Sequence, residues 1–264
     1  MLSERENIAT AELAVYIPSI ALAIAIIFKH GFSKGRPRIY LILFCGLRTA
    51  SAILEILSAK NPANRDDATW TAILGSIGLS PLFLVASGLL RRVNDFIAGG
   101  TSRTRLLEML HIPIMLALIL SIVGGTRISS SDTSKLNSGE TFGKAGAIIS
   151  LISSVVIVAF AMLAMAESRD LPRGEKCILY AVLVSLSFLA VRLLYSLLAD
   201  FEDNNTFNIV GGNATVQLCM AIIQEFVVTF FFLVADLVAP ALDSLVNGAG
   251  GIPMNSYNVG KGVA

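Results

Sequence analysis

Long apolar runs alternate with short polar segments along the whole chain, and this pattern predicts membrane-spanning helices. Seven runs reach the roughly 20 residues that an α-helix needs to cross a bilayer, and they cover residues 9–28, 39–58, 70–90, 106–123, 143–165, 177–198 and 215–237. The runs lack the alternation of apolar and polar residues that is typical of barrel strands. The pattern therefore predicts an all-α, polytopic membrane protein with a bundle of seven transmembrane helices.

Composition agrees with this interpretation. Of the 264 residues, 55% are hydrophobic and 15% are charged, which is more apolar surface than a soluble domain of this length can bury. Residues 1–240 are predicted to form the transmembrane domain, and residues 241–264 a flexible cytoplasmic tail. The first residues lack the basic segment and the small-residue cleavage site of a signal peptide, so the first helix is expected to be retained.

Lysines and arginines between the helices predict the orientation, because cytoplasmic loops keep an excess of positive charge. Twelve lie in the first, third and fifth loops and the tail: Lys29, Lys34, Arg36, Arg38, Arg91, Arg92, Arg103, Arg105, Arg169, Arg173, Lys176 and Lys261. Six lie on the other side: Arg5, Lys60, Arg65, Arg127, Lys135 and Lys144. The N-terminus is therefore predicted outside and the C-terminus in the cytoplasm, in the endoplasmic reticulum or the plasma membrane.

Two glycosylation sequons lie in the loop between the sixth and seventh helices, at Asn204 and Asn213. The count of basic residues independently places this loop outside, where N-glycans are attached. The sequence therefore predicts a glycoprotein. Asn204 is the better acceptor, because Asn213 lies almost against the membrane.

Charged residues in the middle of three predicted helices form the most informative feature of the sequence. Glu225 lies at the centre of the seventh run, where a lone carboxylate costs roughly 3 kcal/mol even on lenient insertion scales. Arg48 lies at the matching depth of the second run, so the two are predicted to pair. Glu55 follows on the same face of that helix, ~10 Å closer to the outer surface. Arg192 of the sixth run lies in the same outer half as Glu55.

These charges predict a polar centre inside the membrane that opens outward and binds a ligand. Each charge neutralises a neighbour that the hydrocarbon would not otherwise tolerate. The candidate ligand-binding residues are Arg48, Glu55, Arg192, Tyr195, Gln217, Gln224 and Glu225. Glu225 and Glu55 are also the candidate catalytic residues. The alternative is that the pairs only fix the register of the helices, as buried ion pairs often do.

Polar residues nearer to the helix ends are interpreted as interface residues. They are Glu12, Glu108, His111 and Asp236. At these depths a side chain can extend to the headgroup region and keep its charge in water. Arg91 and Arg92 are interpreted as cytoplasmic anchors of the third helix.

Several chemistries lack their residues in this sequence. Two histidines are too few for a seven-helix zinc hydrolase, and no metal or cofactor is predicted. The seventh helix has no lysine for a retinal Schiff base, and the chain has no aspartate-rich diphosphate motif, P-loop or GxSG protease motif. The basic residues form no patch for nucleic acid. The three cysteines fall in or at the ends of apolar runs, which is not typical of a disulfide framework.

Four segments carry a recognisable family pattern: GLRTASAILEI (46–56), SIGLSPLFLVASGLLRRVND (76–95), VRLLYSLLADF (191–201) and QEFVVTFFFL (224–233). Together they resemble a family of fungal seven-helix integral membrane proteins of unknown function. The SIGLSP to GLLRRVN run is the most specific element, together with the Arg-x-x-Tyr of the sixth helix and the acidic residue of the seventh. The resemblance implies a fungal source and a seven-helix fold, but no reaction. Genes for such proteins can lie among those for lipophilic secondary metabolites.

The predicted function is the binding of a small lipophilic molecule in the polar centre, as an accessory of fungal secondary-metabolite biosynthesis or export. Two alternatives stay open. One is a membrane-embedded acid/base enzyme, an isomerase or a terpene-cyclase-like protein, with Glu225 or Glu55 as general acid. The other is a seven-helix receptor-like sensor that couples through its basic loops. Membrane lipid and the lipophilic molecule are the expected partners.

Overall fold

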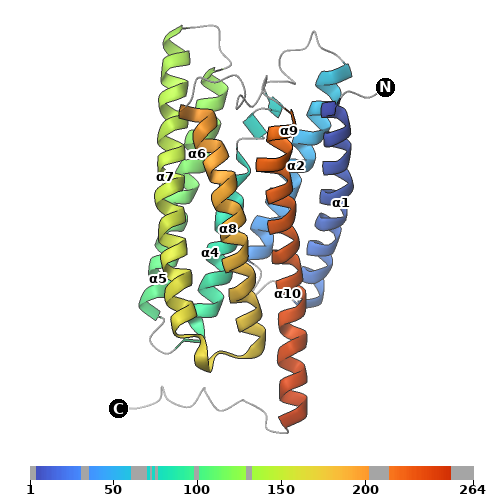
Figure 1. Cartoon of the computed structure of the whole chain (residues 1–264), viewed down its shortest axis with the longest axis vertical. Helices are drawn as coiled ribbons and strands as arrows, with labels where there is room; N and C mark the ends of the chain where they lie inside the picture. The colour runs from blue at the N-terminus through green and yellow to red at the C-terminus, as the bar shows by residue number, and fades with distance from the viewer. Residues whose placement is uncertain are drawn as a thin grey trace.

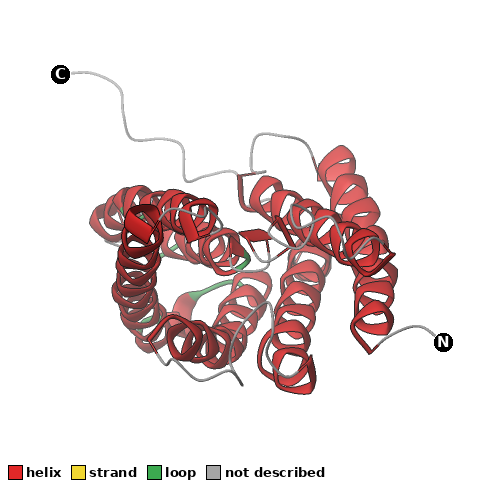
Figure 2. Ribbon diagram, turned by 90° about the horizontal axis from the view of Figure 1, so that it is seen from above, coloured by secondary structure: helices red, strands yellow, loops and turns green. Residues whose placement is uncertain are grey.

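The computed structural model describes residues 4–30, 36–60, 70–71, 73–74, 77–97, 101–128, 133–201 and 214–250. The helices are α1 (Glu4–His30), α2 (Arg36–Lys60), α4 (Leu79–Asp95), α5 (Thr101–Met109), α6 (His111–Ile128), α7 (Thr133–Ala166), η2 (Ser168–Asp170), α8 (Arg173–Phe201), α9 (Ala214–Gln217), η3 (Leu218–Ile222) and α10 (Ile223–Gly250). No strand occurs in the described part of the chain, and the helices are seen end-on in Figure 2. The long helices form one bundle (Figure 1).

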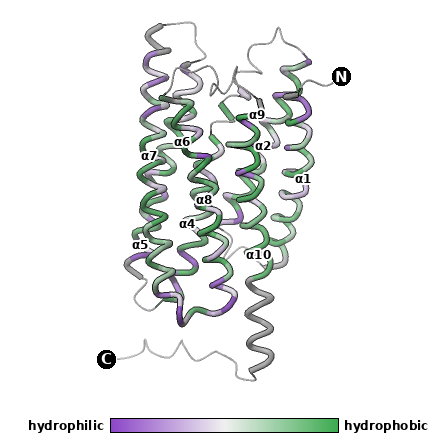
Figure 3. The backbone as a smooth tube through the Cα atoms, in the orientation of Figure 1, coloured by the Kyte–Doolittle hydropathy of each residue, from purple (hydrophilic) through white to green (hydrophobic). Residues whose placement is uncertain are grey.

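Six helical segments in the described ranges are long and apolar enough to cross a membrane. They are Glu6–Phe28, Pro37–Lys60, Arg103–Arg127, Asn137–Ala166, Arg173–Ala199 and Thr215–Val238. Hydrophobic residues predominate along the middle of the long helices, and hydrophilic residues gather at the turn between α7 and α8 (Figure 3). The prediction of an all-helical, multi-pass membrane protein is therefore confirmed. The count of seven spans and the orientation stay predictions.

The third predicted helix, 70–90, corresponds in part to α4, which begins at Leu79 and ends at Asp95. Residues 70–71, 73–74 and 77, which precede α4, are also helical. α4 has 17 residues, and Pro81 lies in its first turn, where the missing N–H of a proline leaves no helical hydrogen bond unmade. The helix packs against α2, α5, α6, α7 and α8, and its residues are buried almost without interruption. α4 is thus an inner helix of the bundle.

Pro113 explains an interruption in the fourth predicted helix, 106–123. α5 ends at Met109, and α6 begins two residues later. A proline at this position cannot donate to the carbonyl of Met109, and its ring crowds that carbonyl. The N–H of Ile114 still bonds to the carbonyl of Leu110 at 3.3 Å. α5 and α6 therefore continue as one span across the break.

Two helices extend furthest beyond their predicted bounds. α7 begins at Thr133, before the predicted start at 143, and α10 continues to Gly250, past the predicted end at 237. In Figure 1 α10 extends beyond the ends of the neighbouring helices. The sequons at Asn204 and Asn213 and the last part of the predicted tail, 251–264, lie outside the described residues.

α6 and α7 approach each other closely at glycines. A Cβ atom on Gly124 would lie 2.9 Å from the backbone nitrogen of Gly143 and 3.0 Å from the carbonyl oxygen of Gly139. These neighbours are backbone atoms, which cannot rotate away as a side chain can. Small residues at such positions let membrane helices pack backbone to backbone, and they hold α6 against α7 here.

Candidate functional site

Four charged residues are buried together in the bundle, and we call them the central cluster. They are Glu12 of α1, Arg48 of α2, Arg192 of α8 and Glu225 of α10. Their exposed fractions are 2%, 3%, 3% and 0%. The structure contains the predicted ion pair between Arg48 and Glu225. Four segments that are distant in the sequence therefore meet at this site.

Glu225 contacts one arginine at each carboxylate oxygen. Nη2 of Arg48 pairs with Oε2, and Nε of Arg192 donates to Oε1 at 2.9 Å. Nη1 of Arg48 also lies 4.0 Å from Oε1 of Glu12. With all four side chains ionised, two positive and two negative charges cancel. The cluster then adds no net charge to the apolar interior, which is the condition for tolerating buried ions.

The last membrane helix changes its winding directly before Glu225. η3 is a π-helical turn, and its first carbonyl accepts the N–H of Ile223. π turns inside α-helices are frequent at functional sites. The side-chain amide of Gln224 donates to the carbonyl of Cys219 in this turn at 3.2 Å. Gln224, a predicted ligand-binding residue, thus contacts its own helix.

Gly78 allows the ion pair to lie against the start of α4. A Cβ atom at this position would lie 3.0 Å from Oε1 of Glu225 and 3.5 Å from both Nε and Nη2 of Arg48. A Cβ atom here would therefore require the carboxylate of Glu225 to move by a few tenths of an ångström. The glycine belongs to the SIGLSP run, so part of that motif serves the central cluster.

Two tyrosines border the central cluster. Cζ of Arg192 lies 5.6 Å from the ring centroid of Tyr195, within cation–π range. Tyr16 is fully buried, and its ring packs edge to face against Phe44 and Phe226 at 5.6 and 5.2 Å. The Tyr16 hydroxyl has no hydrogen-bond partner in the described part of the chain, which is a costly state for a buried hydroxyl group.

The structure brings some of the predicted site residues together and leaves others apart. The ones it joins are Arg48, Arg192, Tyr195 and Glu225. Depth alone placed Arg192 level with Glu55, whereas the structure connects it to Glu225. Glu55 is half-buried further along α2 and interacts electrostatically with Glu12 of the cluster. Gln217 is half-buried at the end of α9. Ligand-binding roles for these two residues stay predictions.

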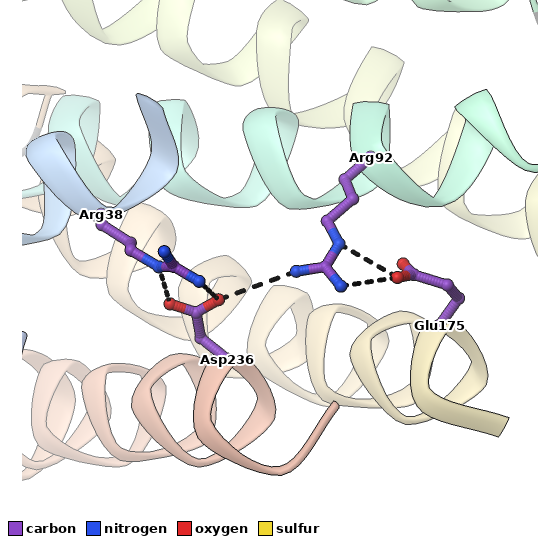
Figure 4. A network of polar contacts seen from close by, with 4 residues as sticks. All are labelled: Arg38, Arg92, Glu175 and Asp236. Atoms are coloured by element: carbon purple, nitrogen blue, oxygen red, sulfur yellow. Dashed lines mark hydrogen bonds and ion pairs between the residues drawn. The ribbon is translucent and has the colours of Figure 1, made fainter. Parts of the chain in front are cut away.

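A second buried network, which we call the end network, lies where α8 begins (Figure 4). It consists of Arg38, Arg92, Glu175 and Asp236, from α2, α4, α8 and α10. Nε and Nη2 of Arg38 donate to the two oxygens of Asp236, with 2.9 Å between Nη2 and Oδ1. Nε and Nη2 of Arg92 donate to Oε1 of Glu175 at 3.0 and 2.6 Å. A single longer contact of 3.8 Å, from Nη1 of Arg92 to Oδ1 of Asp236, connects the two pairs.

The two clusters correct the interpretation of several helix-end residues as interface residues. Asp236 and Glu12 are 7% and 2% exposed, so neither side chain extends to water. Glu175 is fully buried and was not among the candidates. The burial of Asp236 could have been predicted from its spacing. It follows Glu225 by about three helical turns and therefore lies on the same face of the helix. Arg92 holds buried carboxylates in addition to any anchoring role.

Exposed ion pairs on the same bundle differ from these clusters. Nη1 of Arg91 lies 2.8 Å from Oε1 of Glu108, and Arg103 donates to both oxygens of Glu167 at 2.7 Å. The hydrogen bonds from Arg103 hold the pKa of Glu167 below its usual range. Water screens such pairs, so they contribute little to stability. They offer matched positions for control substitutions.

Comparison with known proteins yields one family. A profile described as Domain of unknown function (DUF7702) matches residues 2–241. The match includes every residue of both clusters and stops within α10. No curated protein matches the chain.

Proposed function

Because the chain belongs to the family of the Domain of unknown function (DUF7702), which names no activity, we propose a function from the site alone: the protein binds a small lipophilic molecule at the central cluster. The observation that carries the proposal is the burial, inside an apolar bundle, of four charges and of a Tyr16 hydroxyl that has no hydrogen-bond partner among the described residues. Ionisable residues inside membrane helices mark ligand and ion pathways. In line with the resemblance to fungal membrane proteins, we place the ligand among lipophilic secondary metabolites.

The surroundings of the cluster favour a ligand that is mostly apolar. Phe44 and Phe226 pack on the ring of Tyr16, and Phe44 is fully buried in the hydrophobic core. Ligand sites typically combine an apolar lining with a few placed polar groups. The central cluster supplies such polar groups, and the bilayer supplies a route for an apolar molecule.

The enzyme alternative receives less support from the geometry. Both oxygens of Glu225 contact arginines, so neither oxygen is placed to deliver a proton to a substrate. Glu55 is a candidate through its position on α2. The receptor-like alternative uses the same ligand site, and the basic loops add no separate support for it. Binding is therefore the function that we propose.

We also propose that α4 crosses the membrane in addition to the six other segments, which gives seven spans, and that the C-terminus is cytoplasmic. The excess of lysine and arginine on one side of the membrane supports this orientation. A tag after Ala264 should then be removed when protease is added to sealed microsomes. A protected tag, with a lumenal control protein intact in the same vesicles, would contradict the orientation.

A retention experiment tests the binding function. Wild-type protein and an Arg48→Met, Glu225→Met double variant, both in nanodiscs, are incubated with an organic extract of cells of the source organism. Compounds that stay bound after gel filtration are identified by mass spectrometry. We expect the wild type to retain a lipophilic compound and the double variant to retain about tenfold less of it, because two polar contacts are lost.

The matched control removes one exposed charge of each sign, by Arg91→Met and Glu108→Met. This variant should retain the compound as the wild type does. Equal retention by all three proteins, or by none of them, would contradict binding at the central cluster.

A further inference from the structure

Charge balance limits the kind of ligand that the central cluster can bind. When all four side chains are ionised, the two arginines and two glutamates carry equal and opposite charges, and all four are almost completely buried. A charged ligand would add a charge that no group in the cluster compensates, at a depth where water does not solvate it. An uncharged polar group adds no such charge.

The polar atoms that lack a partner at this site include two hydrogen-bond donors. The Tyr16 hydroxyl and Nε of Arg48 have no hydrogen-bond partner in the described ranges. The ring of Tyr16 packs against Phe226, the residue that follows Glu225, and Tyr16 also interacts electrostatically with Arg48, Glu12 and Glu225. Both donors therefore lie at the central cluster. A guanidinium nitrogen only donates. The complementary ligand group is therefore an acceptor, and a hydroxyl or carbonyl oxygen is an acceptor without charge.

We propose that the central cluster selects an uncharged lipophilic molecule with a hydroxyl or carbonyl oxygen, and that Glu12 sets this selectivity. The inference rests on the proposed binding function and adds the class of ligand. Tyr16 and Arg48 donate to the ligand oxygen. Glu12 lies 4.0 Å from Arg48 and supplies the second negative charge of the cluster. This contact is longer than the 2.9 Å bond between Arg192 and Glu225. Without Glu12 the cluster carries one excess positive charge.

Three photoreactive probes test the inference. They share one diazirine-bearing alkyl chain and end in a hydroxyl, a carboxylate or a quaternary ammonium group. Wild-type protein in nanodiscs is titrated with each probe, and the labelled residues are identified by mass spectrometry. The hydroxyl probe should label residues around the central cluster with an apparent affinity about tenfold or more above that of either charged probe.

The outcomes separate this inference from the binding function. Tighter binding of the carboxylate or ammonium probe at the cluster would overturn the inference and leave binding in place. An absence of saturable labelling near the cluster with all three probes would overturn both.

Two variants assign the roles of the side chains. Glu12→Gln should shift the preference toward the carboxylate probe by about tenfold, because it leaves an excess positive charge. Tyr16→Phe keeps the ring against Phe44 and Phe226. It should lower the affinity for the hydroxyl probe about two- to tenfold without lowering the Tm. Glu167→Gln makes the same chemical change as Glu12→Gln at an exposed site and should leave the ranking unchanged.

An unchanged ranking in a folded Glu12→Gln variant would overturn the role of Glu12. A Tyr16→Phe variant that binds the hydroxyl probe as the wild type does would overturn the role of the tyrosine. If Glu12→Gln fails to fold, the ranking of the three probes on wild-type protein still decides the ligand class.

Discussion

Replacing Glu225 with methionine should destabilise the protein by about 3–5 kcal/mol. The substitution removes the carboxylate that contacts both Arg48 and Arg192, and it leaves two buried guanidinium groups with one remaining glutamate in the cluster. Arg48→Met should cost less, because Glu225 keeps its contact with Arg192. The free energy of unfolding of each variant, measured in the same detergent, checks this order.

The double variant Arg48→Met, Glu225→Met should regain much of the stability that Glu225→Met loses. It removes one buried charge of each sign, so the cluster stays balanced. A double-mutant cycle measures this coupling, and strictly additive losses would contradict an interaction between the two residues. The corresponding cycle at the exposed pair Arg91 and Glu108 should give a coupling of about 0–1 kcal/mol.

Asp236→Asn should also lower the free energy of unfolding by about 3–5 kcal/mol. It removes a carboxylate that receives two bonds from Arg38 and a longer contact from Arg92. The side chain of Arg38 is only 6% exposed, so water cannot replace the lost partner.

Glu175→Gln is the matched comparison, and it should cost less than Asp236→Asn. The arginine that it affects, Arg92, has a side chain that is 23% exposed and can be solvated in part. The Tm values of the two variants decide the order. A Glu175→Gln variant that melts at or below the temperature of Asp236→Asn would contradict this account of the end network.

Depth along predicted helices was sufficient to pair Arg48 with Glu225, because both lie far from either end of their runs and a lone charge there is costly. The same reasoning could not find the pair of Arg38 and Asp236. Both lie near the ends of their predicted helices, where the side chain of an isolated membrane helix could reach water. Their burial depends on how α2, α4, α8 and α10 pack together, which is a property of the tertiary structure.

The apolar runs predicted the existence of the helices better than their ends. Backbone hydrogen bonds continue a helix through polar residues, so α7 begins at Thr133, in a segment that hydropathy alone places outside the membrane. Prolines act locally, and Pro113 accounts for the break between α5 and α6. Gly78 carries no charge or hydropathy signal that could relate it to Glu225, because its role is the space that it leaves.

During synthesis, the arginines of α2 enter the membrane long before their main partners exist. Arg38 and Asp236 are separated by 198 residues, and Glu225 lies on the same late helix. In this interval Glu12 is the carboxylate of the central cluster that α2 can already meet, because α1 packs against α2. A chain that stops before α10 leaves Arg38 and both arginines of the central cluster without their closest acidic partners. These three arginines therefore gain their closest acidic partners inside the membrane only when α10 has been inserted.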